Sequence, residues 1–256
     1  MRRKMGLAML LLSMACVVFA QGVQEVNSVE LLVSAAASTT DCMKELGQRY
    51  QAEHPEVKIQ FNFGSSGALQ QQIEQGAPVD VFLSAAQKQM KALQTKGLMI
   101  DSSVRDLLEN KVVLITSRTG MELASFEKLP DLSVTKIAIG DPQSVPAGQY
   151  AKQVFDSLGI TESISSRLIY AKDVREVLSW VETGNVDVGV VYETDSKIFK
   201  QVRVSAYAPE GTHSPVIYPV GVLKQSKQVD DAVAFVDFLF SEEAKAIFAS
   251  YGFSVL

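Results

Sequence analysis

The sequence predicts an α/β protein built from two lobes. From residue 29 onward, short apolar runs alternate with amphipathic segments, which is the order of strands and helices in α/β folds. The 256 residues, of which 47% are hydrophobic and 21% charged, suffice for two modest domains. The strand and helix segments fall into two clusters, and we therefore expect two lobes with largely parallel sheets.

The predicted strands are short runs rich in Val, Ile, Leu and Phe. Most are bounded by residues that favour turns. The segment from 118 to 135 has no clear period and is predicted to be a loop. The strands cover residues 29–35, 57–63, 79–85, 111–117, 136–142, 167–171, 187–193, 202–209 and 216–225.

The predicted helices lie between these strands and have apolar residues at helical spacing. Gly76, Gly97 and Gly159 are the expected ends of three helices, and Asp173 is the expected N-cap of another. The predicted helical segments are 43–53, 64–76, 87–97, 147–159, 172–184 and a long one from about 229 to 248.

Residues 1–20 are predicted to be a secretory signal peptide. Their sequence, MRRKMGLAMLLLSMACVVFA, has a basic start, an apolar stretch too short for a comfortable membrane span, and small residues before Gln21. Lipid attachment at Cys16 is the alternative, although Ser13 stands where an aliphatic residue is expected. We predict cleavage before Gln21.

The mature chain is acidic. Cleavage removes Arg2, Arg3 and Lys4 and no acidic residue, which takes the formal net charge from -5 to -8. A chain of this charge without a basic run is not expected to bind nucleic acid or an anionic membrane. After cleavage Cys42 is the only cysteine, so no internal disulfide can form and stability must come from the core.

Several strand-to-helix turns share one chemistry. Three alanines precede Ser38, Thr39 and Thr40, and a helix follows at once. The first amides of a helix lack internal acceptors and lie at the positive end of its dipole, so such a turn can bind an anion. Comparable positions are held by residues 64–67 (Gly-Ser-Ser-Gly), Ala147 with Gly148, Val174 and, at a strand end, Tyr192.

Each turn also has a purely structural explanation. Ser or Thr before a helix is commonly a cap, Gly-Ser-Ser-Gly is often a flexible turn, and Tyr192 is of a type that packs at strand ends. Ligands of open α/β sheets, however, bind at the C-terminal ends of strands, where these turns cluster. Together they favour a site of neutral hydroxyls and amides, which selects a fully deprotonated anion because it offers no carboxylate to a ligand proton.

The sequence contains no motif of a common enzyme class. It has neither a Walker-type G-x-x-x-x-G-K nor a G-x-S-x-G. His54 and His213 lie far apart, without zinc-ligand spacing or an evident serine partner. Lys172 and Arg175 flank Val174 but lie outside the apolar stripe of their helix, so we expect both to face water. We predict a protein that is not an enzyme and has no resident cofactor.

Five stretches of the chain together carry a resemblance to a known family. They are VSAAASTTDCMKELGQRY, GSSGALQQQIEQGAPVDVFLSA, GDPQSVPAGQYAK, AKDVREVLSWVETGNVDVGVVYETD and FASYGFSVL. In this order, and over essentially the whole mature chain, they resemble the periplasmic molybdate-binding proteins of ABC importers. The resemblance implies a type II periplasmic-binding-protein fold, with a ligand cleft between two α/β lobes that are joined by two crossover segments. It places 21–112 and 206–256 in lobe I and 113–205 in lobe II.

The resemblance also implies a ligand and its contacts. Members of that family hold molybdate or tungstate through neutral donors only, so no side chain is expected to ligate a metal cation directly. The serines of the matching positions would supply hydroxyl and amide groups, the alanine and valine their amides, and the tyrosine its hydroxyl. The matching residues here are Ser38, Ser66, Ala147, Val174 and Tyr192.

The function that follows from the resemblance is a monomeric periplasmic receptor that delivers molybdate or tungstate to a membrane permease with a cytoplasmic ATPase. Two alternatives remain: a receptor for sulfate or another tetrahedral oxyanion, and a ferric-iron receptor that uses Tyr192, Tyr207 or Tyr218 with carboxylates. Two positions depart from the family pattern. Gly67 stands where a serine or threonine is usual, and Glu193 where a small residue is usual.

Overall fold

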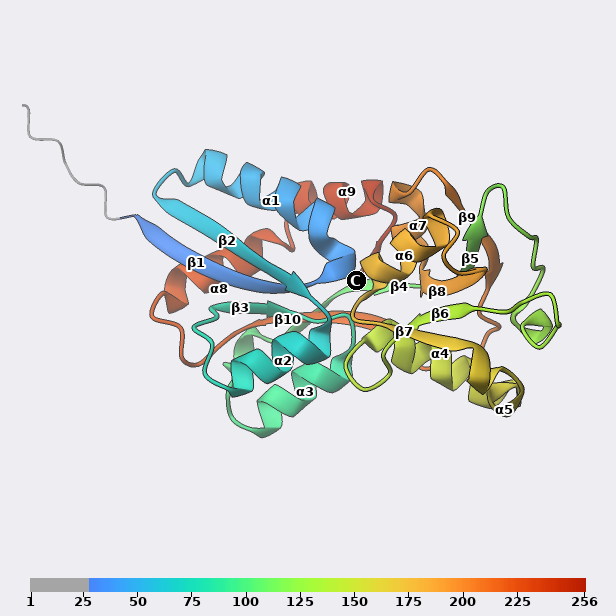
Figure 1. Ribbon diagram of the computed structural model, residues 1–256. Helices are drawn as coiled ribbons and strands as arrows, with labels where there is room; N and C mark the ends of the chain where they lie inside the picture. Colours follow the sequence, from blue (N-terminus) through green and yellow to red (C-terminus); the bar gives the residue numbers. More distant parts are fainter. Residues whose placement is uncertain (1–27) are drawn as a thin grey trace, which may run out of the picture.

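The computed structural model describes residues 28–256 as two α/β lobes that lie side by side (Figure 1). One sheet has six strands in the order β11-β4-β10-β3-β1-β2, and the other has five in the order β7-β6-β8-β5-β9. We call the six-stranded sheet with its helices lobe I and the five-stranded sheet with its helices lobe II. The predicted signal peptide and Cys16 lie outside the described residues.

Lobe I is built from both ends of the described chain. The core occupies both faces of its sheet: α2 and α3 cover one face, and α1, α8 and α9 the other (Figure 1). Its strands are β1 (Val29–Ala36), β2 (Val57–Gly64), β3 (Val81–Leu83), β4 (Arg105–Asn110), β10 (Val216–Val222) and β11 (Ser254–Val255). Its helices are η1 (Ala37–Thr39), α1 (Thr40–Glu53), α2 (Ser66–Glu74), α3 (Gln87–Thr95), η2 (Asp101–Ser103), α8 (Val229–Phe238) and α9 (Glu242–Ser250).

Lobe II is formed by the middle of the chain. The chain crosses between the lobes at Lys111, between β4 and β5, and again through residues 208–215, between β9 and β10. The strands are β5 (Val112–Ser117), β6 (Ile137–Gly140), β7 (Leu168–Ala171), β8 (Val188–Tyr192) and β9 (Val202–Tyr207). The helices are η3 (Phe126–Lys128), α4 (Pro146–Ser157), α5 (Thr161–Ile164), η4 (Ser165–Arg167), α6 (Val174–Glu182) and α7 (Glu193–Ile198).

The prediction of largely parallel sheets is wrong, because both sheets are mixed. Four strand pairings are parallel and five are antiparallel. Strands of β-α-β units such as β1 and β6 end at the cleft between the lobes. Strands β5 and β10 each receive the chain from the other lobe, so they start at the cleft and run the opposite way. Their antiparallel pairing therefore results from the two crossings.

Two further predictions need correction. The long helix expected over about 229–248 is two helices, α8 and α9, because Ser241 acts as an N-cap: its hydroxyl accepts a hydrogen bond from Ala244 N over 3.2 Å. Strand β4 is absent from the prediction because its sequence, RDLLEN, is short and largely polar. Among residues 28–256, no helix combines the length and the apolar character needed to cross a membrane.

Candidate functional site

A small cavity lies between the lobes, where strands β1, β2 and β3 of lobe I and β8 of lobe II end. Its volume is about 10 Å³ for the centre of a water-sized sphere, which is roughly the space of one water molecule and leaves no room for a sugar or a peptide. All five residues predicted for the site line this cavity: Ser38 and Ser66 from lobe I, and Ala147, Val174 and Tyr192 from lobe II. The other lining residues are Ala36, Ala37, Gly64, Ser65, Ala85, Val145, Pro146 and Asp173.

The turn between β1 and α1 contains three hydroxyl side chains, and these differ in what they contact. The hydroxyls of Thr39 and Thr40 donate to the carbonyl oxygens of Ala36 and Ala37 over 2.8 and 2.7 Å, so they stabilise the turn itself. Ser38 alone of the three lines the cavity, and its Oγ lies 3.0 Å from the hydroxyl of Tyr218. The two threonines therefore have the purely structural role that is common for such residues before a helix, whereas Ser38 remains a candidate residue of the site.

The Gly-Ser-Ser-Gly turn gives each of three residues a specific contact. Ser65 is the N-cap of α2, and its Oγ accepts from Ala68 N over 3.4 Å. Ser66 Oγ accepts from Ala85 N over 2.9 Å, which leaves the hydroxyl proton of Ser66 available for a ligand. Gly67 N donates to the carbonyl oxygen of Ser144 in lobe II over 2.9 Å. This turn thus contributes both a cavity donor and a contact between the lobes.

The glycine at position 67 has a steric reason. A Cβ added there would overlap the backbone of Ser144, which lies across the cleft. The serine or threonine that is usual in the family would meet the same backbone in this arrangement of the lobes. The departure at Gly67 therefore permits a closer approach of lobe I to lobe II.

In lobe II the site uses the first turns of two helices. Ala147 follows Pro146 at the start of α4, and Val174 is the first residue of α6. Backbone N–H groups in these positions have no intrahelical acceptor, so they are available to a ligand. The predicted N-cap of α6 is confirmed, because the carboxylate of Asp173 accepts from Glu176 N over 3.0 Å.

Tyr192 supplies a buried hydroxyl with no partner. The side chain ends β8 and is 1% exposed, and no residue in the described part of the chain hydrogen-bonds its Oη. Burial raises the pKa of Tyr192 well above its ordinary value, so the hydroxyl keeps its proton and can donate it. A buried hydroxyl without a partner is costly, and an anion in the cavity would relieve that cost.

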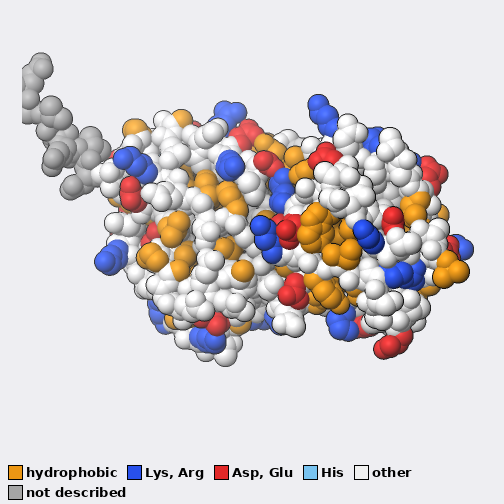
Figure 2. Space-filling view, in the orientation of Figure 1, with side chains coloured by type: hydrophobic (Ala, Val, Ile, Leu, Met, Phe, Trp, Pro, Cys, Tyr) orange, Lys and Arg blue, Asp and Glu red, His pale blue; other side chains and the backbone are white. Residues whose placement is uncertain are grey.

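The cavity has the electrostatics of an anion site without a basic side chain. Its lining residues include no Lys, Arg or His. The expectation of a site without a carboxylate is wrong at Asp173, which lines the cavity and caps α6 through its Oδ1. The positive ends of α2, α4 and α6 face it, together with the turn before α1. Basic and acidic side chains are interspersed over the face shown in Figure 2, without a continuous basic patch there.

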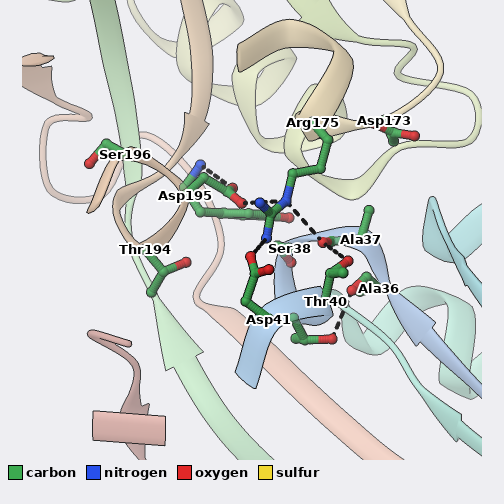
Figure 3. A network of polar contacts seen from close by, with 12 residues as sticks. Ala36, Ala37, Ser38, Thr40, Asp41, Asp173, Arg175, Thr194, Asp195 and Ser196 are labelled. Atoms are coloured by element: carbon green, nitrogen blue, oxygen red, sulfur yellow. Dashed lines mark hydrogen bonds and ion pairs between the residues drawn. The ribbon is translucent and has the colours of Figure 1, made fainter. Parts of the chain in front are cut away.

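The expectation that Arg175 faces water is wrong, whereas Lys172 is exposed as predicted. Arg175 Nη2 lies 2.6 Å from Asp41 Oδ2 in lobe I, and its Nε donates to the carbonyl oxygen of Ala37 over 3.3 Å (Figure 3). The first turn of α6 packs against the turn before α1. The spacing of apolar residues around Arg175 could not show this contact, because its partner lies in the other lobe. Arg175 does not line the cavity.

Asp195 is a buried carboxylate that sequence reasoning missed. It is fully buried behind Arg175, whose Nε lies 3.9 Å from its Oδ1, and its Oδ2 accepts from Tyr192 N over 3.3 Å. Burial raises the pKa of Asp195 to about 7, although the charge of Arg175 acts in the opposite direction. Its place two residues after the helix-starting Glu193 gave no signal that it would be buried.

The three tyrosines considered for ferric iron do not converge on the cavity. Tyr218 is fully buried behind Ser38, and its ring centroid lies 5.7 Å from that of Tyr192. Tyr207 is 51% exposed and donates its hydroxyl to Glu193 Oε1 over 3.0 Å. Within residues 28–256, no group of three or more His, Cys, Asp or Glu side chains is placed to hold a metal ion.

The fold defines a two-lobed solute-binding protein, in which residues of both lobes enclose one small cavity. The chain belongs to the bacterial extracellular solute-binding proteins, whose family model matches residues 31–254. The observed architecture is that of the type II periplasmic-binding proteins, as the sequence predicted.

The chain is also similar to individual proteins that are named as solute-binding proteins. YvgL of Bacillus subtilis, whose name provisionally assigns it to an ABC transporter as a substrate-binding lipoprotein, is 43% identical over 89% of this chain and 87% of its own. The molybdate-binding protein ModA of Haemophilus influenzae is 36% identical over 95% of this chain and 97% of its own. A solved substrate-binding domain from Clostridium difficile, provisionally assigned to a molybdenum ABC transporter, is 44% identical with a TM-score of 0.69, covering 90% of this chain and 100% of its own. The resemblance seen in the sequence is confirmed.

Proposed function

We propose that this protein is the extracytoplasmic receptor of an ABC importer and that it binds molybdate or tungstate as a dianion. The observation that supports this most directly is the convergence of uncharged donors from both lobes on one small cavity. Hydroxyls of Ser38, Ser66 and Tyr192 and first-turn amides at Ala147 and Val174 would surround the four oxygens of the ligand.

Neutral donors suffice for a dianion in such a place. Several preorganised N–H and O–H groups in a dry cleft, backed by helix N-termini, stabilise charge that water would otherwise solvate. The donors proposed to surround the ligand are hydroxyls and amides, and the one carboxylate of the lining, Asp173, already uses its Oδ1 to cap α6. A ligand proton that faced these donors would be buried without an acceptor, which is costly.

The comparisons support the ligand and the partner. Relatives that cover most of this chain are named as molybdate-binding proteins, and a family of extracellular solute-binding proteins implies secretion, which fits the predicted signal peptide. In this proposal the protein is a monomer in the periplasm, has no catalytic activity and no resident cofactor, and delivers its ligand to a membrane permease with a cytoplasmic ATPase.

Calorimetry of the purified protein against molybdate, tungstate, sulfate and phosphate at one pH tests the proposal. Saturable binding of molybdate or tungstate with one site per chain is expected. Sulfate would bind to the same donors but is smaller than molybdate, so the relative affinities show which of the two anions the cavity fits. Tighter binding of sulfate would make sulfate the ligand of this receptor. Saturable binding of phosphate alone would overturn it, and visible absorption on adding ferric iron would favour a metal receptor.

A further inference from the structure

A chain of buried hydrogen bonds lies behind Ser38. Ser38 Oγ is 3.0 Å from Tyr218 Oη, and Tyr218 Oη is 3.3 Å from Asn110 Nδ2. Tyr218 is fully buried, and Asn110 and Ser38 are 8% and 4% exposed. Neither Tyr218 nor Asn110 lines the cavity, so neither would touch a ligand. What they can determine is how the hydroxyl of Ser38 is oriented.

The backbone fixes the orientation of the Asn110 amide. Its Oδ1 accepts a hydrogen bond from Lys111 N over 2.9 Å, at the point where the chain crosses into lobe II. Its Nδ2 is therefore the atom that faces the other side, where it donates to Thr194 Oγ1 over 2.9 Å and to Tyr218 Oη. Nδ2 has protons and no lone pair to offer, so Tyr218 must accept from it.

The direction of the next bond follows. The Tyr218 hydroxyl has one proton, and burial raises its pKa well above the ordinary value, so that proton stays in place. Among the described residues, Ser38 Oγ is the acceptor that lies in hydrogen-bonding distance of this hydroxyl, whereas Tyr192 Oη makes no hydrogen bond. If Ser38 donated to Tyr218 instead, the buried phenol proton would have no partner, which is costly. Tyr218 therefore donates to Ser38, and the proton of Ser38 is free to point into the cavity.

Ser66 is arranged in the same way by a different group. Its Oγ accepts from Ala85 N over 2.9 Å, and Ala85 itself lines the cavity. Each serine of the site thus accepts a hydrogen bond from the protein and turns its own proton toward the ligand. An accepted hydrogen bond also polarises a hydroxyl and makes it a stronger donor.

We propose that Asn110 and Tyr218 are positioning residues that hold Ser38 as a donor toward the anion, so that the site discriminates against tetrahedral oxyanions that retain a proton. This inference rests on the proposed function. If a protonated ligand oxygen lay near Ser38, two hydroxyl protons would face each other and neither would find an acceptor. In molybdate, every oxygen can accept the hydrogen bond from Ser38. Discrimination between two dianions of the same charge and shape is thereby assigned to residues behind the cavity.

The test compares molybdate with hydrogen phosphate, at a pH where phosphate is the dianion, in the intact mature protein. The variant Tyr218→Phe removes the donor to Ser38 and leaves the ring. We expect the affinity ratio of molybdate to hydrogen phosphate to fall about tenfold, because the Ser38 hydroxyl can then turn and accept from a protonated ligand oxygen. Tyr50→Phe, a buried tyrosine of the same lobe away from the cavity, is the matched control and should leave the ratio unchanged.

Two further variants keep the inference testable if Tyr218→Phe folds poorly. Asn110→Asp keeps the shape of the side chain but gives Tyr218 a carboxylate to donate to, so the ratio should also fall. Because both ligands are dianions, the added charge weakens both alike and cancels in the ratio. In a Ser38→Ala background, Tyr218→Phe should have no further effect on the ratio, since it acts through Ser38.

The outcomes separate the two proposals. If the wild-type protein binds neither molybdate nor tungstate, the proposed function fails and this inference fails with it. If the wild type binds molybdate but Tyr218→Phe and Asn110→Asp weaken both anions equally, only this inference is overturned, and Tyr218 is a structural residue. An undiminished effect of Tyr218→Phe in the Ser38→Ala background would overturn it as well.

Discussion

Arg175 of α6 and Asp41 of α1 form an ion pair across the cleft, with Arg175 Nη2 2.6 Å from Asp41 Oδ2 (Figure 3). The same guanidinium donates to the carbonyl oxygen of Ala37, directly before Ser38. Neither partner of the ion pair lines the cavity. The pair therefore stabilises the contact between the lobes without touching the ligand site.

Replacing Arg175 with Gln should weaken molybdate binding by about two- to fivefold, because the contact between the lobes around the cavity loses an ion pair whose side chains are 22% and 39% exposed and partly screened by solvent. Calorimetry measures the affinity, and stopped-flow release should show faster dissociation. Arg203→Gln is the control, since Arg203 pairs with Glu122 inside lobe II over 2.7 Å. Equal affinities for both variants and the wild type would show that the Arg175 pair does not contribute to binding.

Tyr192→Phe should separate binding from stability. Its hydroxyl is buried without a partner among the described residues, so its removal should raise the free energy of unfolding of the ligand-free protein by about 1 kcal/mol. Loss of a hydrogen bond to a charged ligand should weaken molybdate binding by about tenfold to a hundredfold. Tyr150→Phe, whose ring centroid lies 6.4 Å from that of Tyr192, should change affinity far less. Unaltered molybdate affinity in Tyr192→Phe would remove this hydroxyl from the proposed donor set.

Gly67→Ala should weaken the contact between the two lobes. The added Cβ would overlap the backbone of Ser144 in the other lobe, so the lobes cannot approach as closely and the Gly67 N–Ser144 O bond is weakened. We expect weaker molybdate binding with an unchanged thermal midpoint of the free protein. Gly120→Ala, where the new Cβ meets only ordinary contacts within lobe II, is the control. Wild-type affinity in Gly67→Ala would mean that the contact between the lobes at Ser144 tolerates a side chain here.

The buried Asp195 predicts a pH dependence of stability. Its pKa is about 7 in the folded protein and 3.8 as the ordinary value, so between these pH values the folded state holds a proton that the unfolded state has lost. The free energy of unfolding therefore falls as the pH rises through this window. Asp195→Asn removes this loss, and its stability relative to wild type should increase by at least ~1 kcal/mol between about pH 4 and about pH 8 in urea denaturation.

Asp187→Asn is the control for this pH series, and its stability relative to wild type should change with pH in the opposite direction. Burial acts to raise the pKa of Asp187, but hydrogen bonds from Thr135 and Lys136 outweigh it and lower the pKa. Asp187→Asn should therefore lose stability relative to wild type as the pH rises through the acid range. If the stability of Asp195→Asn relative to wild type does not change with pH, Asp195 is ionised in the folded protein.

Ligand affinity should change little with ionic strength. The cavity is lined without Lys, Arg or His, and the net charge of -8 expected after cleavage repels a dianion at long range. Capture then depends on amides and helix termini that act at short range in a site screened little by salt. A steep fall in the association rate of molybdate with added sodium chloride would show that a basic side chain attracts the ligand.

Much of the fold could be predicted because its signals are local. The spacing of apolar residues in α6 and the cap at Asp173 are set by neighbours within a few positions. Strand β4 and the direction of β10 could not be predicted in this way, because they depend on pairing with strands far away in the sequence. The break between α8 and α9 had a local signal, the serine at position 241 followed by two glutamates, that the apolar pattern masked.

The cavity residues were predictable for a related reason. A strand-to-helix turn with small or hydroxyl residues is visible in the sequence, and the ends of β-α-β strands meet at one edge of a sheet. The residues behind the cavity had no such signal. Tyr218 is separated from Ser38 by 180 positions, and Asn110 belongs to β4, a strand that the sequence did not predict.

The sequence by itself determined the order of strands and helices, the helix starts that supply free amides, and the family to which the chain belongs, because each depends on local spacing or on residues in chain order. Only the tertiary structure decided the mixed strand directions, the ion pair of Arg175 with Asp41 and the orientation of the Ser38 hydroxyl. These depend on contacts between residues far apart in the sequence, which exist only once the chain has folded. The contacts lie within a lobe for the strand directions and for Ser38, and between the lobes for Arg175.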